Sequence, residues 1–540
     1  MPRTVKVAVV GSGLAGLTAG YLLTSSHPQD DVEFDVHIFE KTPTLGMDSS
    51  SMSIGSGDGE WRIDVPMRSF QGGYYPHLIE LYRQLGVAFR PKDFSYCFSV
   101  FSPPSEKGAT PLQTTMIYNG ASGREGVSMP AWLRDHHLKQ KSHRAITRVF
   151  TFGLFLLATL HLVVCYIRLL FLVLPPLRSR KVSTQTFEQW TQETTPRHFI
   201  GRMLGWDSMW QSFTQDILVP LFSAVCTAPE ADIMTHPVED FLDYIWLTLG
   251  THHFVVEKGV RDVVSRLTSN MKNVHLSSQI VGIHVDPSNA SLASIECAAK
   301  NGTVTYDGFH HVVFATQATR ACPMLSTYAT SLATDPHARQ AIMAQINALE
   351  AFHYVRTVVI NHTDESELLL PSDPSDRRDL NLVHCPPSSS SSHETEKPWS
   401  PHRVSSDYTM ATHILTSPSS TAPAVFQTTN PFVPIHEEHI LSVATLERAV
   451  LTLPSKAALR GLCKTATPSW YQCPAEMDCQ LGDLQGAGRL QSDAHAGIWL
   501  VGSYASVGIP LLEGCVVSAK NVYLAICKTE GIPPSVASQF

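Results

Sequence analysis

The 540-residue sequence predicts an α/β fold built around a Rossmann-like dinucleotide-binding domain. A β-branched run at residues 5–10 breaks into a Gly-x-Gly-x-x-Gly motif at residues 11–16 and then into a helical pattern. A second strand pattern follows at residues 32–39 and ends at Glu40. A carboxylate at this position can accept a hydrogen bond from a ribose hydroxyl. The order of strand, glycine loop, helix, strand and acidic residue therefore predicts a nucleotide site.

The three glycines of the motif have different roles in this prediction. Gly11 permits a tight turn, Gly13 lets the backbone approach a pyrophosphate, and Gly16 lets the helix pack against the strand. The helix N-terminus then faces the anion. A glycine-rich turn without a nucleotide is the alternative interpretation, but the second strand and its acidic end favour binding. The residues expected to bind are Gly11, Ser12, Gly13, Leu14, Ala15, Gly16, Glu40 and Lys41.

The composition excludes several classes of protein. Hydrophobic residues make up 43% of the chain and charged residues 16%, so the chain can bury a large core and form two joined domains. A formal net charge of -8 without a sustained basic run argues against nucleic-acid binding. The first strand pattern begins at Val5, which leaves no room for a signal peptide. We therefore expect the protein in the cytoplasm or on the cytoplasmic face of a membrane.

The cysteines and histidines do not predict a metal site. Eleven cysteines without a Cys-x-x-Cys pair indicate reduced thiols rather than a disulfide framework, although Cys473 and Cys479 could form a bridge or bind a metal. The sequence His436-Glu-Glu-His439 lacks the i, i+4 spacing of a zinc-binding His-Glu-x-x-His motif. No Gly-x-Ser-x-Gly elbow follows a predicted strand, so Ser/His/Asp catalysis has no support either.

Residues 5–20 resemble the FAD-binding fingerprint of the amine oxidase and phytoene desaturase superfamily. Residues 40–46 resemble the continuation of that fingerprint, and residues 497–503 and 512–518 resemble the segment that closes over ribityl and flavin in the family. Residues 64–87 look most like a subgroup of predicted NAD/FAD-binding oxidoreductases related to amine oxidases. The resemblance thus covers stretches from both ends of the chain.

The resemblance implies an FAD cofactor held by separated segments. Beyond the N-terminal loop, it places Ile280, Gly502, Ser503, Glu513 and Gly514 at the cofactor. The family usually has Gly-Arg where this sequence has Met47 and Asp48, and an acidic residue where it has Ser503. A hydroxyl can still hydrogen-bond a ribityl or phosphate oxygen, so we expect FAD to bind.

The resemblance also implies a domain organisation. It predicts a discontinuous FAD-binding domain of the glutathione reductase type at residues 1–75, 250–330 and 490–530, and an α+β substrate domain at residues 76–249 and 331–489. The turn that carries Arg68, Tyr74 and Tyr75 is expected close to the flavin, which makes these three residues candidates for catalysis. Ordinary packing is the alternative for all three, and no residue is compelled to act as a base.

A nearly continuous apolar run occupies residues 149–177 and is broken chiefly by His161 and Arg168. Its length would allow it to cross a bilayer. A single crossing, however, would separate the glycine loop from the C-terminal flavin segment, and both must meet at one cofactor. We therefore expect a helix that lies in one leaflet or caps an apolar substrate channel, with Arg168 reaching the headgroups. A fully buried helix is the alternative.

A second unusual segment follows the strand pattern at residues 354–361. Residues 371–401 are rich in Ser, Pro and charge and include a serine run at residues 388–392. Such a composition buries little apolar surface, so we expect a disordered insertion there.

The expected activity follows from the implied flavin. A flavin carries the difficult chemistry while the protein positions a C–H bond, so we expect hydride transfer that creates C=C, C=N or C=O by desaturation or oxidation. The apolar run favours a lipophilic small-molecule substrate of secondary or lipid metabolism, such as an acyl chain, isoprenoid or polyketide, and a membrane surface as a partner. Two alternatives stay open: a flavin monooxygenase that uses NAD(P)H, and a non-catalytic lipid- or prenyl-binding module of the same fold.

Overall fold

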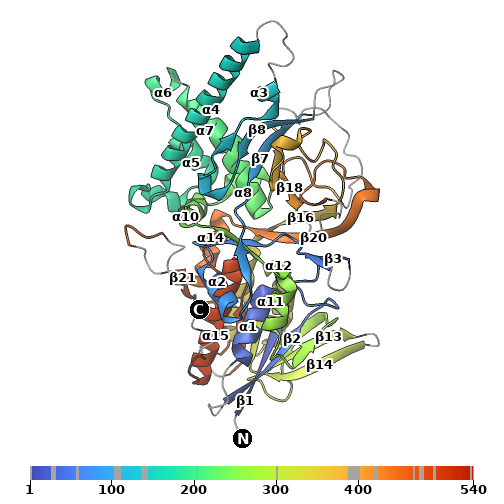
Figure 1. Cartoon of the computed structure of the whole chain (residues 1–540). Coiled ribbons are helices and arrows are strands. Elements are labelled where there is room, and N and C mark those ends of the chain that lie inside the picture. Colours follow the sequence, from blue (N-terminus) through green and yellow to red (C-terminus); the bar gives the residue numbers. More distant parts are fainter. Residues whose placement is uncertain are drawn as a thin grey trace.

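The fold divides into a lower part that carries both the N-terminal strand and the C-terminal helix, and an upper part that ends in a group of helices (Figure 1). The computed structural model describes residues 3–25, 32–55, 60–102, 111–135, 144–203, 205–299, 302–386, 402–416, 424–465, 469–473, 479–489, 494–535 and 538. The chain passes between the two parts several times, so each part is assembled from distant segments.

A five-stranded parallel sheet forms the centre of the lower part. Its strands are β1 (Arg3–Val10), β2 (Val32–Phe39), β11 (Asn273–His275), β15 (His311–Phe314) and β23 (Gly497–Leu500), in the order β11-β2-β1-β15-β23. Each neighbouring pair is parallel. The strand order reverses direction between β1 and β15, which is the switch point at which doubly wound sheets bind ligands. The predicted Rossmann-like fold class is confirmed.

Both faces of this sheet are covered, because the side chains of β1 alternate between two cores. Val7 and Val9 belong to one core, and Ala8 and Val10 belong to the other. The first face carries α1 (Leu14–Thr24), α2 (Pro76–Gln84), α11 (Gly259–Leu267) and α15 (Leu512–Glu530). The second carries the antiparallel strands β12 (Ile280–Val285), β13 (Ala293–Ala299) and β14 (Gly302–Phe309), with α12 (Ala318–Ser331) and α13 (Pro336–Glu350). This domain therefore continues past residue 330, where the sequence predicted its second segment to end.

An eight-stranded sheet forms the base of the upper part. Its order is β20-β16-β19-β18-β17-β7-β8-β9. The strands are β7 (Tyr96–Phe101), β8 (Leu112–Tyr118), β9 (Val127–Ser128), β16 (His353–His362), β17 (Leu380–His384), β18 (Met410–Leu415), β19 (Val425–Thr429) and β20 (Ile440–Val450). The helices of this part are α3 (Ala131–Asp135), α4 (Arg144–Val173), α5 (Phe187–Thr194), α6 (Phe199–Met203), α7 (Trp206–Phe213), α8 (Val219–Cys226), α9 (Glu230–Thr235) and α10 (Val238–Thr248). The upper part thus contains both a sheet and helices, as expected for the α+β domain predicted from the sequence.

Short elements connect the two parts. They are β3 (Met52–Ile54), β4 (Trp61–Ile63), β5 (Ser69–Gln71), β6 (Phe89–Pro91), β10 (His253–Val256), α14 (Leu453–Leu459), β21 (Cys463–Thr465) and β22 (Cys479–Leu481).

Cys463 and Cys479 are joined as a disulfide with Cα atoms 5.9 Å apart. The expectation of reduced thiols is therefore wrong for this pair, because the pairing of β21 with β22 brings the two side chains together. Cys473, the other cysteine considered for a bridge, is not part of it.

Part of the segment predicted to be disordered is ordered. Strand β17 lies within residues 371–401 and is buried along its whole length between β18 and β7. The expectation was wrong there because the apolar Leu380, Leu382 and Val383 form a strand within an otherwise polar stretch. The serine run falls in residues 387–401, which lie outside the described residues.

Helix α4 projects along the upper end of the molecule (Figure 1). Its Arg148–Val173 portion is, among the described residues, the one helix long and apolar enough to cross a membrane. Most of its side chains are exposed, including Val149, Phe150, Phe152, Leu154, Leu157, Leu160, Val164, Ile167 and Phe171. Cys165, Leu169 and Val173 are buried against α7 and α10. The alternative of a fully buried helix is wrong.

Candidate functional site

The glycine loop lies at the carboxyl end of β1, between β2 and β15. Gly11 has a φ of +100°, and its amide donates to the carbonyl oxygen of Phe39 at 2.9 Å. A Cβ at this position would lie 2.8 Å from the carbonyl oxygen of Ala315. A Cβ at Gly16 would lie 2.1 Å from the carbonyl oxygen of Gly11. Glycine is therefore required at both positions for α1 to begin so close to the strand.

Gly13 faces open space at the start of α1. It is the N-cap of the helix and makes no side-chain capping bond, and a Cβ built on it would meet no atom within 4 Å. Behind it, the hydroxyl of Ser12 accepts a hydrogen bond from the amide of Gly46 at 2.8 Å, which holds the following loop against the motif. A helix N-terminus with open space before it stabilises an anion, so the loop fits the pyrophosphate of a dinucleotide.

Glu40 lies beside this loop and binds it. Its carboxylate accepts hydrogen bonds from the amide and hydroxyl of Ser12, at 3.1 and 2.5 Å, and from those of Thr42, at 2.9 and 2.8 Å. Burial by itself would raise the pKa of Glu40, but the hydrogen bonds from Ser12 and Thr42 outweigh it and lower that pKa. The carboxylate is therefore ionised at the edge where a ribose would be accepted.

Two further predicted residues lie near Glu40. The amide of Ser278 donates to the carbonyl oxygen of Glu40 at 2.8 Å, which brings the segment that leads to Ile280 to the same edge of the sheet. Lys41, in contrast, is exposed. The fold thus brings Ile280 close to the loop from a distant segment, while the side chain of Lys41 lies in solvent.

The C-terminal segment reaches the same edge after β23. The amide of Gly502 donates to the hydroxyl of Ser518 at 3.0 Å, and a Cβ at Gly514 would lie 2.8 Å from the carbonyl oxygen of Ser503. The first turn of α15 therefore packs directly against the residues that follow β23. This places a second helix N-terminus beside the one at the glycine loop.

Glu513 has a different role from the other predicted residues of this segment. Its carboxylate accepts hydrogen bonds from the amides of His77 and Leu78, at 2.9 and 3.0 Å, at the N-terminus of α2. Nδ1 of His77 lies 2.8 Å from the same carboxylate. The side chain therefore caps α2 and leaves only its backbone available to a cofactor.

A large cavity of about 1080 Å³ lies between the two parts of the molecule. Its floor includes Pro66 and Arg68 from the turn before β5, Ser503 from the turn after β23, and Leu512 and Cys515 from the start of α15. Its walls include Phe155, Leu162 and Tyr166 of α4, and Leu221 and Phe222 of α8. A π-helical turn at Thr214–Leu218 contributes Ile217 and Leu218, a feature that is frequent at functional sites. The cavity is large enough for a drug-sized ligand and mostly apolar.

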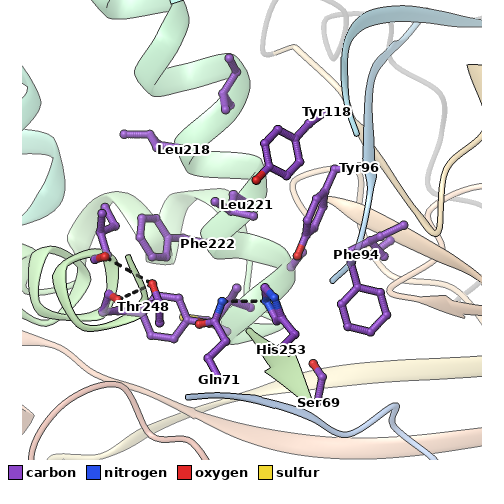
Figure 2. A pocket seen from close by; sticks show the side chains of 18 of the residues that line it. Ser69, Gln71, Phe94, Tyr96, Tyr118, Leu218, Leu221, Phe222, Thr248 and His253 are labelled. Atoms are coloured by element: carbon purple, nitrogen blue, oxygen red, sulfur yellow. Dashed lines mark hydrogen bonds between the residues drawn. The ribbon is translucent and has the colours of Figure 1, made fainter. Parts of the chain in front are cut away.

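A polar cluster lies on one side of the cavity (Figure 2). Nε2 of Gln71 and Nε2 of His253 are 2.7 Å apart, and the ring edges of Tyr96 and Tyr118 lie nearby with centroids 5.9 Å apart. Burial lowers the pKa of His253 to about 4, so the ring is uncharged at neutral pH and can accept the proton of the Gln71 amide. The side chains of Gln71 and His253 thus offer hydrogen bonds without charge, next to Asp93, which also lines the cavity and accepts from the amide of His253 at 3.3 Å.

A comparison with known protein families agrees with the glycine loop and the parallel sheet described above. A family model described as an NAD(P)-binding Rossmann-like domain matches residues 9–85. The chain contains a Rossmann-like domain. No curated protein matches the sequence.

Solved structures resemble the chain over nearly its whole length, at low identity. One is cyclohexylamine oxidase from Brevibacterium oxydans IH-35A, with 12% identity, coverage of 98% of this chain and 99% of that chain, and a TM-score of 0.49. Another is an oxidoreductase from Methanosarcina mazei, with 9% identity, coverage of 96% and 99%, and a TM-score of 0.48. A third is a double mutant of putrescine oxidase, with 13% identity, coverage of 97% and 100%, and a TM-score of 0.47.

The three residues predicted as catalytic candidates lie in different surroundings next to the Rossmann-like domain. Arg68 and Tyr75 line the cavity. The hydroxyl of Tyr74 instead accepts a hydrogen bond from the amide of Ile509 at 2.8 Å, in a buried position outside the cavity wall. Tyr74 therefore packs the turn before α15, which is the alternative considered for it.

The sequence did not indicate the polar cluster. Gln71 and His253 are 182 residues apart, and neither belongs to a motif. The one available signal was the alternation of side chains along the strands that carry them. This alternation predicts which face of the strand a side chain occupies but not which residue it contacts. In the described part of the chain, no three His, Cys, Asp or Glu side chains gather as metal ligands would.

Proposed function

We propose that the protein is an FAD-dependent oxidoreductase that takes hydride from a lipophilic small molecule. The observation that carries this proposal is the continuity of the cavity. The same mostly apolar space touches Ser503 in the turn after β23, Cys515 at the start of α15, and Tyr166 of α4. A cofactor that begins at the glycine loop and passes the start of α15 would present its reactive end to this space.

The residues that would hold the FAD come from three segments of the Rossmann-like domain. The open space before Gly13 suits the pyrophosphate, and the ionised carboxylate of Glu40 suits a ribose hydroxyl. The backbone from Gly502 to Ser503 and at Gly514 lies where the flavin end would follow. When bound, a flavin supplies the acceptor for a hydride from a substrate C–H bond.

The side chains of the cavity provide orientation and exclude water. The apolar walls from α4 and α8 would hold a hydrocarbon portion of the substrate, because burial of apolar surface is favourable at about 25 cal/mol per Å². Tyr96, Tyr118 and His253 offer uncharged hydrogen-bonding groups on one side. These contacts would select the position of the reacting carbon, and no step requires a charged base among them.

The exposed side of α4 supports docking on a membrane, with the protein on its cytoplasmic face. The apolar side chains of α4 are joined at the upper end by Phe199 and Met203 of α6, which are 81% and 70% exposed. Arg148, Arg197 and Arg202 are exposed on the same helices or next to them, where they would attract anionic lipid. Since the other side of α4 forms a cavity wall, a lipophilic substrate could pass from lipid to cavity over one helix.

The test is a visible absorbance spectrum of the purified protein after incubation with FAD and removal of free flavin, followed by anaerobic addition of alkylamines, prenols and fatty acids. Bound flavin that loses its visible absorbance with one of these classes supports the proposal. Protein that takes up no flavin overturns it and favours a lipid-binding module. Bound flavin that is reduced only by NAD(P)H overturns the hydride-donor role of the substrate and favours a monooxygenase.

A further inference from the structure

Two of the arginines that line the cavity, Arg68 and Arg448, have no partner for their charge among the described residues. Arg68 precedes β5, and Arg448 lies near the end of β20. The Nε atom of each is buried and has no hydrogen-bond acceptor. The side chain of Arg448 makes no hydrogen bond or ion pair with any described residue, and the side chain of Arg68 makes one hydrogen bond, to the carbonyl oxygen of Met47 at 3.2 Å.

The carboxylates around them are bound elsewhere. Burial raises the pKa of Asp64 and the charge of Arg68 acts to lower it, but the two carboxylate oxygens of Asp64 accept the amide of Val260 at 3.0 and 3.1 Å and form no ion pair with Arg68. Glu447, the neighbour of Arg448 in the chain, points to the surface and contacts Arg320 at 3.5 Å. Among the described residues, neither cavity arginine has a carboxylate oxygen within ion-pair distance.

The two positive charges act on one another inside the protein. Burial, and then the charge of Arg68, lower the pKa of Arg448 to about 10, so the Arg448 guanidinium is still charged at neutral pH. Bringing two like charges out of water is unfavourable unless a counter-charge is supplied. Both residues line the cavity, so a ligand in the cavity can supply this counter-charge.

We propose that Arg68 and Arg448 bind the carboxylate of an amphipathic substrate whose hydrocarbon portion lies against α4 and α8. The planar fork of a guanidinium matches a carboxylate with two parallel hydrogen bonds. Outside these arginines and the polar cluster near Gln71 and His253, most of the cavity wall is apolar, so a carboxylate with a hydrocarbon chain meets both kinds of surface. This inference names the substrate class of the proposed function and rests on it.

The experiment compares ligands that differ only in the head group. Calorimetry of the FAD-loaded protein with octanoate, octan-1-ol and octylamine measures binding without turnover. We expect octanoate to bind about 10- to 100-fold more tightly than octan-1-ol, since hydrogen bonds to charged groups are the strong ones. Octylamine should bind most weakly. Arg448→Met should remove the preference for octanoate, and Arg448→Lys should keep part of it.

Arg320→Met is the matched control, because Arg320 is exposed and lies next to the same strand end without entering the cavity. It should keep the full preference. The melting temperature of Arg448→Met should equal or exceed that of the wild type, since an unpaired buried charge is removed. Equal binding of octanoate and octan-1-ol by the wild type, or an unchanged preference in Arg448→Met, overturns the inference.

Two further outcomes separate this inference from the proposed function. If the protein takes up no flavin yet prefers octanoate through Arg448, the proposed function fails while the carboxylate site stands. If Arg448→Met shifts the reduction potential of bound flavin and leaves the octanoate preference unchanged, the arginine pair serves the cofactor. The inference then fails and the proposed function stands.

Discussion

Arg168 of α4 donates to the carbonyl oxygen of Thr194 at 2.5 Å, at the end of α5. Its guanidinium also lies 5.2 Å from the ring centroid of Trp210 on α7. The one cation in the middle of α4 therefore points into the protein, and the expectation that it reaches lipid headgroups is wrong. This contact sets the rotation of α4, so that its exposed side carries only apolar side chains over several turns.

The exposed side of α4 predicts binding to lipid vesicles. Leu160→Glu, at a position that is 58% exposed, should reduce co-flotation with anionic vesicles about tenfold or more, because a carboxylate in the apolar layer costs free energy. The melting temperature should stay the same. Val304→Glu, on the exposed β14 of the Rossmann-like domain, is the control and should float as the wild type does. Equal flotation of both variants would show that α4 does not contact lipid.

The open space before Gly13 predicts a loss of flavin binding without a loss of folding. Gly13 has a φ of -67°, which every residue adopts, so Gly13→Val should fold normally. Its side chain would occupy the place of the pyrophosphate, and bound flavin should fall to about one tenth or less of the wild-type ratio. Gly16→Val should instead destabilise the fold by about 3 kcal/mol or more, because its Cβ meets the carbonyl of Gly11. Absorbance and thermal melting measure both effects.

Glu513 predicts a stability effect that is separate from cofactor binding. Glu513→Ala removes the acceptor of two amides at the start of α2 and should cost about 1–2 kcal/mol, or a few degrees of melting temperature. Glu513→Gln keeps one acceptor oxygen, so its melting temperature should lie between those of Glu513→Ala and the wild type. The flavin content of both folded variants should match that of the wild type. Loss of flavin with an unchanged melting temperature would assign the carboxylate to the cofactor.

Glu530 predicts a pH dependence of stability. Burial would raise its pKa, but the hydrogen bond from His311 and the charge of Arg489 outweigh burial and lower the pKa to about 2. A carboxylate whose pKa is lower when folded contributes stability above its unfolded value, near 4.5, and this contribution is lost as the pH falls toward 2. Glu530→Gln should lose about 3 kcal/mol at neutral pH.

The melting temperature as a function of pH checks this prediction. The wild type should lose part of its stability between about pH 5 and pH 2, and Glu530→Gln should lose less over the same window. Arg3, which lies 2.7 Å from the other carboxylate oxygen, adds to the same effect. Parallel curves for the two proteins would show that Glu530 contributes no pH-dependent stability.

The sequence by itself determined the first strand, the glycine loop and the helix that follows, together with the acidic end of the second strand. The motif itself encodes the close approach of Gly16 to the carbonyl oxygen of Gly11. Gly11 takes a positive φ in the turn, and the residue that crowds it, Ala315, comes from a distant segment. The nearly continuous apolar run in β1 likewise predicts a strand buried on both faces.

Only the tertiary structure decided which distant side chains meet. Gln71 meets His253 because β5 and β10, from separate segments, pair there. Arg68 and Arg448 line one cavity although Arg68 precedes β5 and Arg448 lies in β20, two strands of different sheets. Helix α4 is apolar on almost every side, so its sequence indicates a helix but no inward face. The contacts of Arg168 with Trp210 and Thr194 determine which face of α4 points into the protein. Local pattern determines an element, whereas the partners of its side chains depend on long-range packing that no single stretch of sequence encodes.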